Sequence, residues 1–516
     1  MSKIIDESLQ KVARGTAISF VGTVVGLGLS FATTVVVVRH ITQSEYGIYS
    51  LALTVISIVV LLSLLGLESG IARYIGYFKG KDDVERISAV GSSSVKFALM
   101  AAIPLFLFLF FASDLISVKI FHSPELSLPL RILATGLPFS ALTTVFISLF
   151  RGLEKVEVGV YFANFLLPSI FLVLILVVIL WWDFGFTGVI YAYLASILFT
   201  FIAISIYTRK KLPFPLIRKT GNSSMGKELL VFSLPLLATG VVGTVMNYTD
   251  TLMLGNMMMP GDVGLYNTAV PLARLLALPV TALLIIYTPV ISGLYARNLM
   301  NEIKRNYIII TKWISSLVLP LFLVLFLFPE TILGFFYGSS YIPASIALRI
   351  LALGQIIDVL LGPNGATLIS IGRPRFVMWV TIICAGVNVV LNILLIPRLG
   401  IAGAAIATTV SAELMKIIRG IKLYSLTGIQ PLSKNLVKPA LTSTGLIIII
   451  YFIVTNFLQV TFWMLPIIFI LFYGLYAISM LFTKSFDQED IAMLLKIEKR
   501  TGINASTIKR RLKRFL

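Results

Sequence analysis

Arg274 lies inside a long apolar stretch, where a charged side chain needs a structural or chemical reason. The residues on either side of it are uncharged back to Leu265 and forward to Ala296. In a bilayer, a charge at the centre of a helix costs about 2.5–3.5 kcal/mol. A guanidinium stays charged and can bind phosphate oxygens through two hydrogen bonds. We therefore expect Arg274 to line a water-filled cavity and hold an anionic ligand, the alternative being an ion pair with Asp250 or Asp358.

Other polar side chains lie at similar depth in neighbouring apolar runs. Asn388 and Asn392 are four residues apart, so they share one face of a helix. Asp358 precedes "GPNG" (362–365), a glycine and proline break of the kind that often borders a transport site. A proline kink satisfied by neighbouring helices is the alternative. Asn247 and Asp250 are one turn apart near the outer end of their run, at a cavity mouth or at the membrane interface.

Three basic residues are weaker candidates. Arg131 and Arg349 recur in two similar segments, "LRILATG" and "LRILALG", which indicates a shared role in capping or headgroup contact. Lys312 lies near enough to the cytoplasmic side for its long side chain to reach water. Glu413 and Lys416 are three residues apart, and we expect them to pair with each other.

The composition indicates which class of fold must position these residues. The chain has 516 residues, of which 58% are hydrophobic and 13% charged, with a mean hydropathy of +0.97. Soluble proteins are about 25% charged. Since a membrane-spanning helix needs about 20 apolar residues, we predict an all-α polytopic membrane protein with fourteen spans, at 15–38, 45–66, 88–111, 130–150, 157–181, 184–208, 229–254, 264–290, 307–328, 346–372, 375–396, 399–421, 435–458 and 460–483.

The basic residues indicate the orientation of these spans. They gather in alternate connections, including 209–227, while the other connections between spans hold only Arg39, Lys119 and Arg398. Basic loops stay in the cytoplasm, so we place both termini there and the protein in the cell membrane. This pattern also accounts for the net charge of +19 without nucleic acid.

The sequence contains an internal repeat. "LRILATG" (130–136) recurs at 348–354, "FGFTGVIYAYLAS" (184–196) resembles "LGIAGAAIATTVS" (399–411), and "YGIY" (46–49) resembles "VGLY" (263–266). Shared apolar composition is the competing explanation. The offset covers six spans, so the copies are parallel and related by a pseudo-two-fold axis, with a transport site expected at their seam. The predicted parts are 1–208 (spans 1–6), the linker 209–228, 229–424 (spans 7–12), 425–483 (spans 13–14) and the basic amphipathic tail 484–516.

Several function classes lack their motifs. There is no G-x-x-x-x-G-K-[ST] nucleotide loop, no H-E-x-x-H and no paired cysteine motif. Cys384, His40 and His122 suggest no metal site. We therefore predict no catalytic residue, no metal and no cofactor. The first fifteen residues show no small-residue cleavage pattern, so we expect no cleaved signal peptide.

Three segments carry a family resemblance: "GTAISFVGTVVGLGLSFATTVVVVRHITQSEYGIYSLA" (15–52), "GLESGIARYIGYFKGKDDVE" (66–85) and "SLPLLATGVVGTVMNYTDTLMLG" (233–255). Together with the span order, they resemble the polysaccharide transporters of the multidrug/oligosaccharidyl-lipid/polysaccharide (MOP) superfamily, the Wzx-like flippases. The resemblance implies transport of a polyprenyl- or dolichyl-(pyro)phosphate-linked oligosaccharide from the cytoplasmic to the outer leaflet by alternating access.

The resemblance also implies partners and energy coupling. The expected partners are the lipid-linked oligosaccharide, membrane lipids and glycan polymerase or glycosyltransferase machinery. Without a nucleotide site, an ion gradient or the membrane potential would supply energy, with Asp250 and Asp358 as the acids to test. The rival functions are a cation-coupled multidrug exporter of the same superfamily, which usually has twelve spans, and a membrane-embedded glycan transferase or scaffold.

Overall fold

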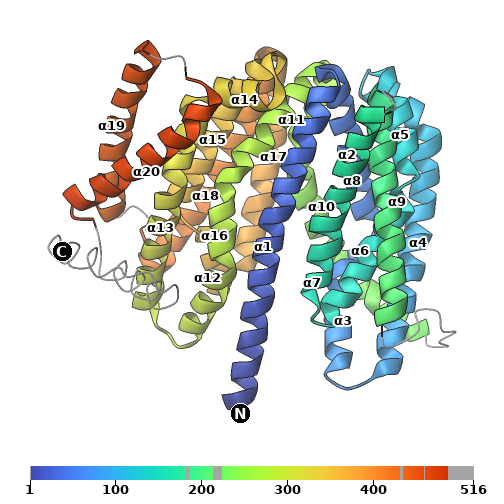
Figure 1. Ribbon diagram of the computed structural model, residues 1–516. Coiled ribbons are helices and arrows are strands. Elements are labelled where there is room, and N and C mark those ends of the chain that lie inside the picture. Colours follow the sequence, from blue (N-terminus) through green and yellow to red (C-terminus); the bar gives the residue numbers. More distant parts are fainter. Residues whose placement is uncertain (1, 182–184, 213–222, 431–433, 458–459, 486–516) are drawn as a thin grey trace. The chain divides into compact units, whose positions relative to one another are not determined.

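The computed structural model describes residues 2–181, 185–212, 223–430, 434–457 and 460–485 (Figure 1). Within these ranges the regular structure is helical, without strands. Thirteen helices are long and apolar enough to cross a membrane, or fourteen if the bent pair Pro124–Ala134 and Leu137–Gly152 forms one span. Each of the fourteen corresponds to a predicted span, so the predicted fold class is confirmed. The predicted tail, 484–516, lies almost wholly outside the described residues.

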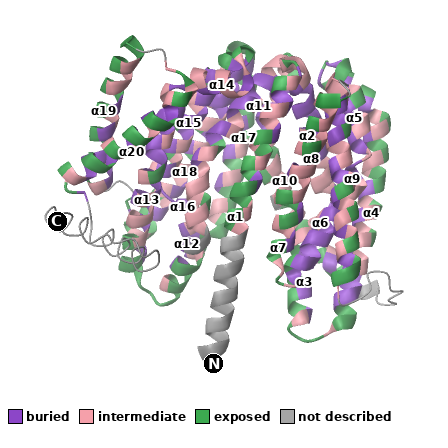
Figure 2. Cartoon of the chain, in the orientation of Figure 1, coloured by how far each residue is buried: buried purple, intermediate pink, exposed green. Residues whose placement is uncertain are grey.

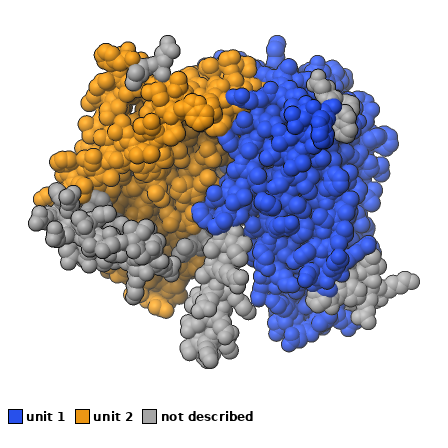
Figure 3. Space-filling view, viewed as in Figure 1, with its two compact units in different colours: residues 1–267, 392–401 blue, residues 268–391, 402–516 orange. Residues whose placement is uncertain are grey.

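The chain forms two compact units, Met1–Asn267 with Asn392–Ile401 and Thr268–Leu391 with Ala402–Leu516 (Figure 3). The elements up to the first unit boundary are α1 (Ser2–His40), α2 (Gln43–Ser63), α3 (Leu67–Lys79), α4 (Val84–Leu115), the π-helix η1 (Ile116–Ile120), the 3₁₀ turn η2 (Pro124–Leu126), α5 (Ser127–Ala134), α6 (Leu137–Gly152), α7 (Val156–Gly159), the π-helix η3 (Val160–Leu166), α8 (Leu167–Trp181), α9 (Gly185–Lys211), α10 (Ser223–Met257) and α11 (Pro260–Arg274), which crosses the boundary.

The remaining elements belong to unit 2, apart from the end of α17 and the first residue of α18. They are η4 (Leu275–Ala277), α12 (Leu278–Ala296), α13 (Met300–Leu327), α14 (Pro329–Tyr337), η5 (Ser339–Ala344), α15 (Ser345–Leu360), α16 (Asn364–Ser370), α17 (Pro374–Leu399), α18 (Ile401–Thr427), α19 (Lys434–Phe457), η6 (Phe462–Met464) and α20 (Leu465–Phe482). The division into compact units thus places α10 in unit 1. The division by sequence repeat instead assigns the corresponding span, 229–254, to the second copy. The repeat-based division concerns sequence similarity and stays a prediction.

Two predicted spans are interrupted beside candidate residues. The span predicted at 264–290 divides into α11 and α12 at the 3₁₀ turn Leu275–Ala277. Pro279 explains this break, because a proline lacks the N–H that would bond to the carbonyl four residues earlier and its ring clashes with that carbonyl. The break predicted at "GPNG" is also present: α15 ends at Leu360, Gly362 has a φ of +72°, and α16 begins at Asn364.

Each unit has its own apolar core. In unit 1, α2 packs on α10 and α3 on α6, burying residues such as Leu51, Ile71 and Leu149 completely. In unit 2, Tyr287, Tyr307 and Leu368 belong to a buried cluster that joins α12, α13 and α16. Helix α13 is largely buried, whereas much of α4 is exposed, as expected for helices that face protein and lipid respectively (Figure 2).

Backbone geometry supports the sequence repeat. Gly185 and Gly400 occupy matching positions, and both have left-handed backbones with φ of +53° and +56°. Gly47 of "YGIY" and Gly264 of "VGLY" bring α2 and α11 together within unit 1. A Cβ at Gly47 would lie 1.7 Å from the Pro260 oxygen, and one at Gly264 would lie 2.3 Å from the Gln43 oxygen. The two segments therefore approach through bare backbone.

Replacing Gly47 with alanine tests this contact. We expect Gly47→Ala to lower the stability of the protein by about 1–3 kcal/mol, because the backbones must separate to admit the methyl group. The measurement is the fraction of monodisperse protein after heating in detergent. Gly28→Ala is the matched control, because nothing lies within 4 Å of its added Cβ. Equal melting of the two variants would contradict the close approach.

Candidate functional site

Arg274 is the last residue of α11, directly before the 3₁₀ turn. Its side chain is exposed, and no hydrogen bond or ion pair joins it to another described residue of unit 2. Asp358, one of its two predicted partners, pairs with Lys416 instead. Its position at a helix C-terminus is favourable, because the backbone carbonyls there carry partial negative charge. An accessible guanidinium is thus available to an anionic group.

Three polar side chains form a row on α12, beyond the 3₁₀ turn that follows Arg274. Thr281, Thr288 and Ser292 are seven and four residues apart, which places them on one face of this helix. Thr281 and Ser292 are exposed and Thr288 is partly exposed. Their hydroxyls donate to carbonyl oxygens of the same helix at 2.9–3.0 Å. Each retains acceptor capacity, so this polar row suits water or a hydroxyl-bearing ligand better than acyl chains.

Asp250 and Asn392 come together in unit 1. The Asn392 amide donates to Oδ1 of Asp250 at 2.9 Å, and the Tyr266 hydroxyl donates to Oδ2 at 2.5 Å. The exposed fractions of Asp250 and Asn392 are 7% and 0%. Hydrogen bonds to a carboxylate offset part of its burial cost. The sequence indicated Asp250 and Asn392 but not Tyr266, which is sixteen residues from Asp250 along the chain.

The other amide candidates have local partners. Asn247 is exposed and donates to the Gly243 oxygen of its own helix at 3.0 Å. In unit 2, Asn388 donates to the Thr408 hydroxyl of α18 at 3.2 Å and is only 4% exposed. Although Asn388 and Asn392 share a helix face, Asn388 makes its hydrogen bond within unit 2 and Asn392 makes its own within unit 1. Asn247 is thus accessible, whereas Asn388 is held by a helix contact.

The expected pair between Glu413 and Lys416 is wrong. The Lys416 ammonium lies 2.8 Å from Oδ1 of Asp358 and also donates to the Gly362 carbonyl at 3.3 Å. It therefore ties α18 to α15 and to the break between α15 and α16. Spacing of three residues permits a pair on one helix, but here an acid from another helix is the partner.

Lys312 is 1% exposed, on α13. Its ammonium donates to the Ser485 carbonyl at 3.5 Å, next to the end of α20. This burial differs from the expected approach to water, since the lysine is enclosed by protein within unit 2.

Arg131 and Arg349 occupy matching settings in the two units. Arg131 pairs with Asp114 at 2.7 Å and donates to the Ser113 hydroxyl at 3.2 Å. Arg349 pairs with Glu330 at 2.7 Å and donates to the Phe326 carbonyl at 3.1 Å. Arg131 thus joins α5 to α4, and Arg349 joins α15 to α13 and α14.

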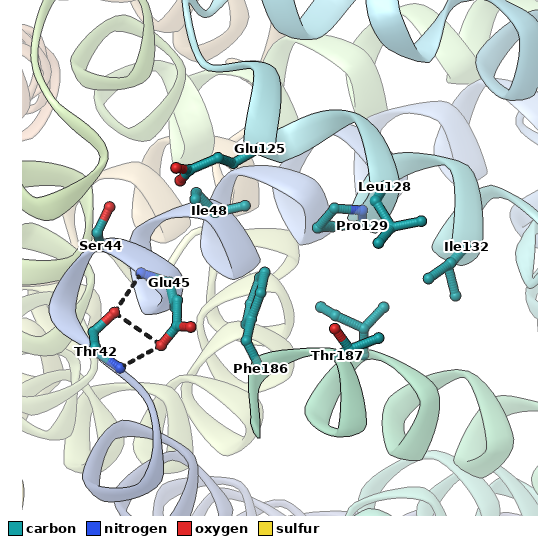
Figure 4. A pocket seen from close by; sticks show the side chains of 11 residues that line it. Thr42, Ser44, Glu45, Ile48, Glu125, Leu128, Pro129, Ile132, Phe186 and Thr187 are labelled. Atoms are coloured by element: carbon teal, nitrogen blue, oxygen red, sulfur yellow. Dashed lines mark hydrogen bonds between the residues drawn. The ribbon is translucent and has the colours of Figure 1, made fainter. Parts of the chain in front are cut away.

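Unit 1 also contains a cavity that the sequence did not indicate. Its volume is about 390 Å³, and it lies at the beginnings of α2, α5 and α9 (Figure 4). One oxygen of Glu45 accepts hydrogen bonds from the Thr42 N–H and hydroxyl at 2.7 and 2.8 Å, forming a capping box. The lining is acidic and apolar, without a base: Thr42, Ser44, Glu45, Ile48, Glu125, Leu128, Pro129, Ile132, Phe186, Thr187 and Ile190. These residues come from distant connections, so no local motif marked them.

Solved transporters share this helical arrangement. A multidrug resistance MATE family transporter of the MOP superfamily, in an inward-facing conformation, has a TM-score of 0.68 at 16% identity, covering 78% of this chain and 94% of that one. The lipid II flippase MurJ, in an inward closed conformation, has a TM-score of 0.70 at 15% identity, covering 89% and 98%. The fold is therefore that of MOP superfamily transporters.

The sequence places the chain more narrowly. Residues 12–295, more than half of the chain, match the family model described as "Polysaccharide biosynthesis protein", and residues 235–394 match MatE. The chain belongs to the polysaccharide biosynthesis protein family. This confirms the predicted resemblance and a multi-pass membrane transporter rather than an enzyme.

Curated relatives cover different parts of the chain. The uncharacterized membrane protein MJ1068 of Methanocaldococcus jannaschii is 22% identical, covering 80% of this chain and 83% of that protein. The capsular polysaccharide biosynthesis protein CapF of Staphylococcus aureus is 23% identical, covering 76% and 94%. The probable low-salt glycan biosynthesis flippase Agl15 of Haloferax volcanii is 27% identical, covering 40% and 43%.

Removing the Tyr266 hydroxyl tests the buried carboxylate network. We expect Tyr266→Phe to lower stability by about 1–3 kcal/mol, because Asp250 loses a buried donor. The measurement is thermal unfolding in detergent, followed by fluorescence. Tyr161→Phe is the control, since Tyr161 is 50% exposed and has no hydrogen bond among the described residues. If both variants unfold at the wild-type temperature, the Tyr266 bond does not support the carboxylate.

Proposed function

We propose that this protein is a flippase for a lipid-linked oligosaccharide and that Arg274 binds the phosphate or pyrophosphate of the carrier. The transported molecule would be a polyprenyl- or dolichyl-linked glycan, moved from the cytoplasmic to the outer leaflet for assembly of surface polysaccharide or glycoprotein. The exposed guanidinium at the end of α11, which has no hydrogen bond or ion pair to another described residue of unit 2, is the observation that carries this proposal.

The family and its relatives support the choice of substrate class. The family is named for polysaccharide biosynthesis, and two Haloferax volcanii relatives are named as probable flippases. A glycan carrier joins a sugar to a polyprenyl or dolichyl chain through an anionic phosphate or pyrophosphate. Arg274 and the polar row through Thr281, Thr288 and Ser292 offer partners for the phosphate and for hydroxyl groups, while the carrier's chain would remain in the bilayer.

The direction and energy source are also part of the proposal. The distribution of basic residues supports cytoplasmic termini in a cell membrane. Alternating access would expose Arg274 to each side in turn. An ion gradient or the membrane potential would drive this exchange, and Asp250 and Asp358 are the first acids to test. The glycan polymerase or glycosyltransferase machinery would act before or after translocation.

A multidrug exporter is the second candidate function. Residues 235–394 match MatE, and a protein of Burkholderia vietnamiensis named multidrug resistance protein NorM is 31% identical over 194 residues. That similarity covers 34% of this chain. Drug efflux with normal glycan display would favour this candidate. If the glycan never reaches the lipid carrier in cells that lack the protein, a transferase or scaffold role would gain support.

The decisive measurement is translocation of a defined lipid-linked oligosaccharide by the reconstituted protein, with and without an imposed gradient. We expect Arg274→Ala to reduce translocation about 10- to 100-fold, because a charge-assisted bond contributes about 1.5–3 kcal/mol. Arg274→Lys should retain part of the rate, since lysine keeps the charge but lacks the guanidinium fork.

Arg297→Ala is the matched control, because Arg297 follows α12 and is exposed. It should leave the rate unchanged. Wild-type translocation by Arg274→Ala would exclude Arg274 as the phosphate ligand. Absence of translocation by the wild-type protein, together with drug uptake, would exclude the flippase itself.

A further inference from the structure

Glu413 is a buried carboxyl group without a partner. It lies near the middle of α18, is 8% exposed, and neither of its carboxyl oxygens has a hydrogen-bond partner among the described residues. Such a group is costly as an anion, because a buried charge without pairing or hydrogen bonds loses its hydration without compensation. A proton on the carboxyl removes most of this cost.

The surroundings of Glu413 contain a charged pair that could respond to this proton. Lys416, one turn along α18, forms its ion pair with Asp358 of α15, and both charges act on Glu413. The side chains of Lys416 and Asp358 are 14% and 30% exposed. The carboxyl is therefore more deeply buried than the pair beside it, which is partly exposed.

Other titratable groups of unit 2 reach this cluster through Asp358. The charge of Asp358 acts on Tyr307 of α13 and on Arg419 of α18, and Cys384 of α17 lies within electrostatic range of Arg419. The guanidinium of Arg419 donates to the Thr381 hydroxyl at 2.6 Å instead of pairing with Asp358. Lys416 is thus the cation that can exchange between the carboxyl groups of Asp358 and Glu413.

We propose that Glu413 is a proton-binding site and that its proton decides which acid Lys416 pairs with. With the proton present, Glu413 is neutral and Lys416 pairs with Asp358, as observed. Release of the proton to solvent leaves a carboxylate three residues from Lys416 on the same helix, within reach of its flexible side chain.

The exchange has a structural consequence at the broken helix. The ammonium of Lys416 also donates to the Gly362 carbonyl at 3.3 Å, between α15 and α16. The Asn364 amide donates to the Lys416 carbonyl at 2.9 Å, so this break is held against α18 at two points. Movement of Lys416 to Glu413 removes one of them. Proton release would therefore loosen the α15–α16 break, whichever substrate the protein carries.

Infrared difference spectroscopy on the purified full-length protein tests the proposal directly. A protonated carboxyl has a C=O stretch separate from that of a carboxylate. We expect one such band at neutral pH in the wild type and its loss in Glu413→Gln, which keeps the shape of the side chain. Glu157→Gln is the control, because Glu157 is exposed and should not contribute a protonated band at that pH.

Two further variants separate partner exchange from burial alone. Asp358→Asn should leave Lys416 free for Glu413, so that the band disappears at a pH lower by about one unit or more, a tenfold weaker proton affinity. Lys416→Met should shift the same midpoint upward by a similar amount. An acid whose midpoint is set by burial alone would show neither shift.

Several results would overturn the proposal. These are a neutral-pH spectrum without a protonated band, a band that survives in a well-folded Glu413→Gln protein, or midpoints that do not move in the other two variants. A band that vanishes on adding sodium ions at constant pH would indicate a metal cation as the ligand instead. These outcomes do not depend on translocation, so they are distinct from failure of the flippase assay.

Discussion

The low polarity of the bilayer restricts every charged side chain in a span to pairing, neutralisation or contact with water. Pairing is observed directly, and the other two solutions are those proposed for Glu413 and Arg274. Asp358 pairs with Lys416, and Asp250 accepts hydrogen bonds from Tyr266 and Asn392. Glu413 has no hydrogen-bond partner among the described residues, which favours a neutral acid, and Arg274 is exposed.

A helix break lies beside two of these charged residues, Arg274 and Asp358. Pro279 ends the regular helix beside Arg274, and Gly362 with Pro363 ends it beside Asp358. A break releases backbone carbonyls from the helix ladder, and one of them, from Gly362, accepts a hydrogen bond from Lys416. In unit 2, the helix break therefore provides a backbone acceptor for the charged side chain beside it.

Much of the fold follows from sequence because apolar length and proline chemistry are local properties. The fourteen spans and the break at 362–365 could be predicted in this way. The short helices α3 and α14 could not, since they are too short for a span and connect longer ones.

The candidate residues could be predicted from the free-energy cost of a polar side chain in a membrane. Their hydrogen-bond and ion-pair partners could not. Asp250 could be selected from the sequence, whereas Tyr266 and Asn392 reach it only through packing. The pairing of Glu413 with Lys416 was wrong for the same reason, since spacing on one helix gives no information about Asp358 on another.

The approach of Gly47 to Gly264 bears on the speed of motion. Interlocked side chains must be withdrawn from their neighbours before two helices can separate, and this raises the activation barrier. Here the contact is made by smooth main chain, secured by the hydrogen bond from the Gln43 amide to the Gly261 carbonyl at 3.0 Å. At these two glycines the segments can slide past each other without displacing a side chain, whereas the hydrogen bond between Gln43 and Gly261 must first break.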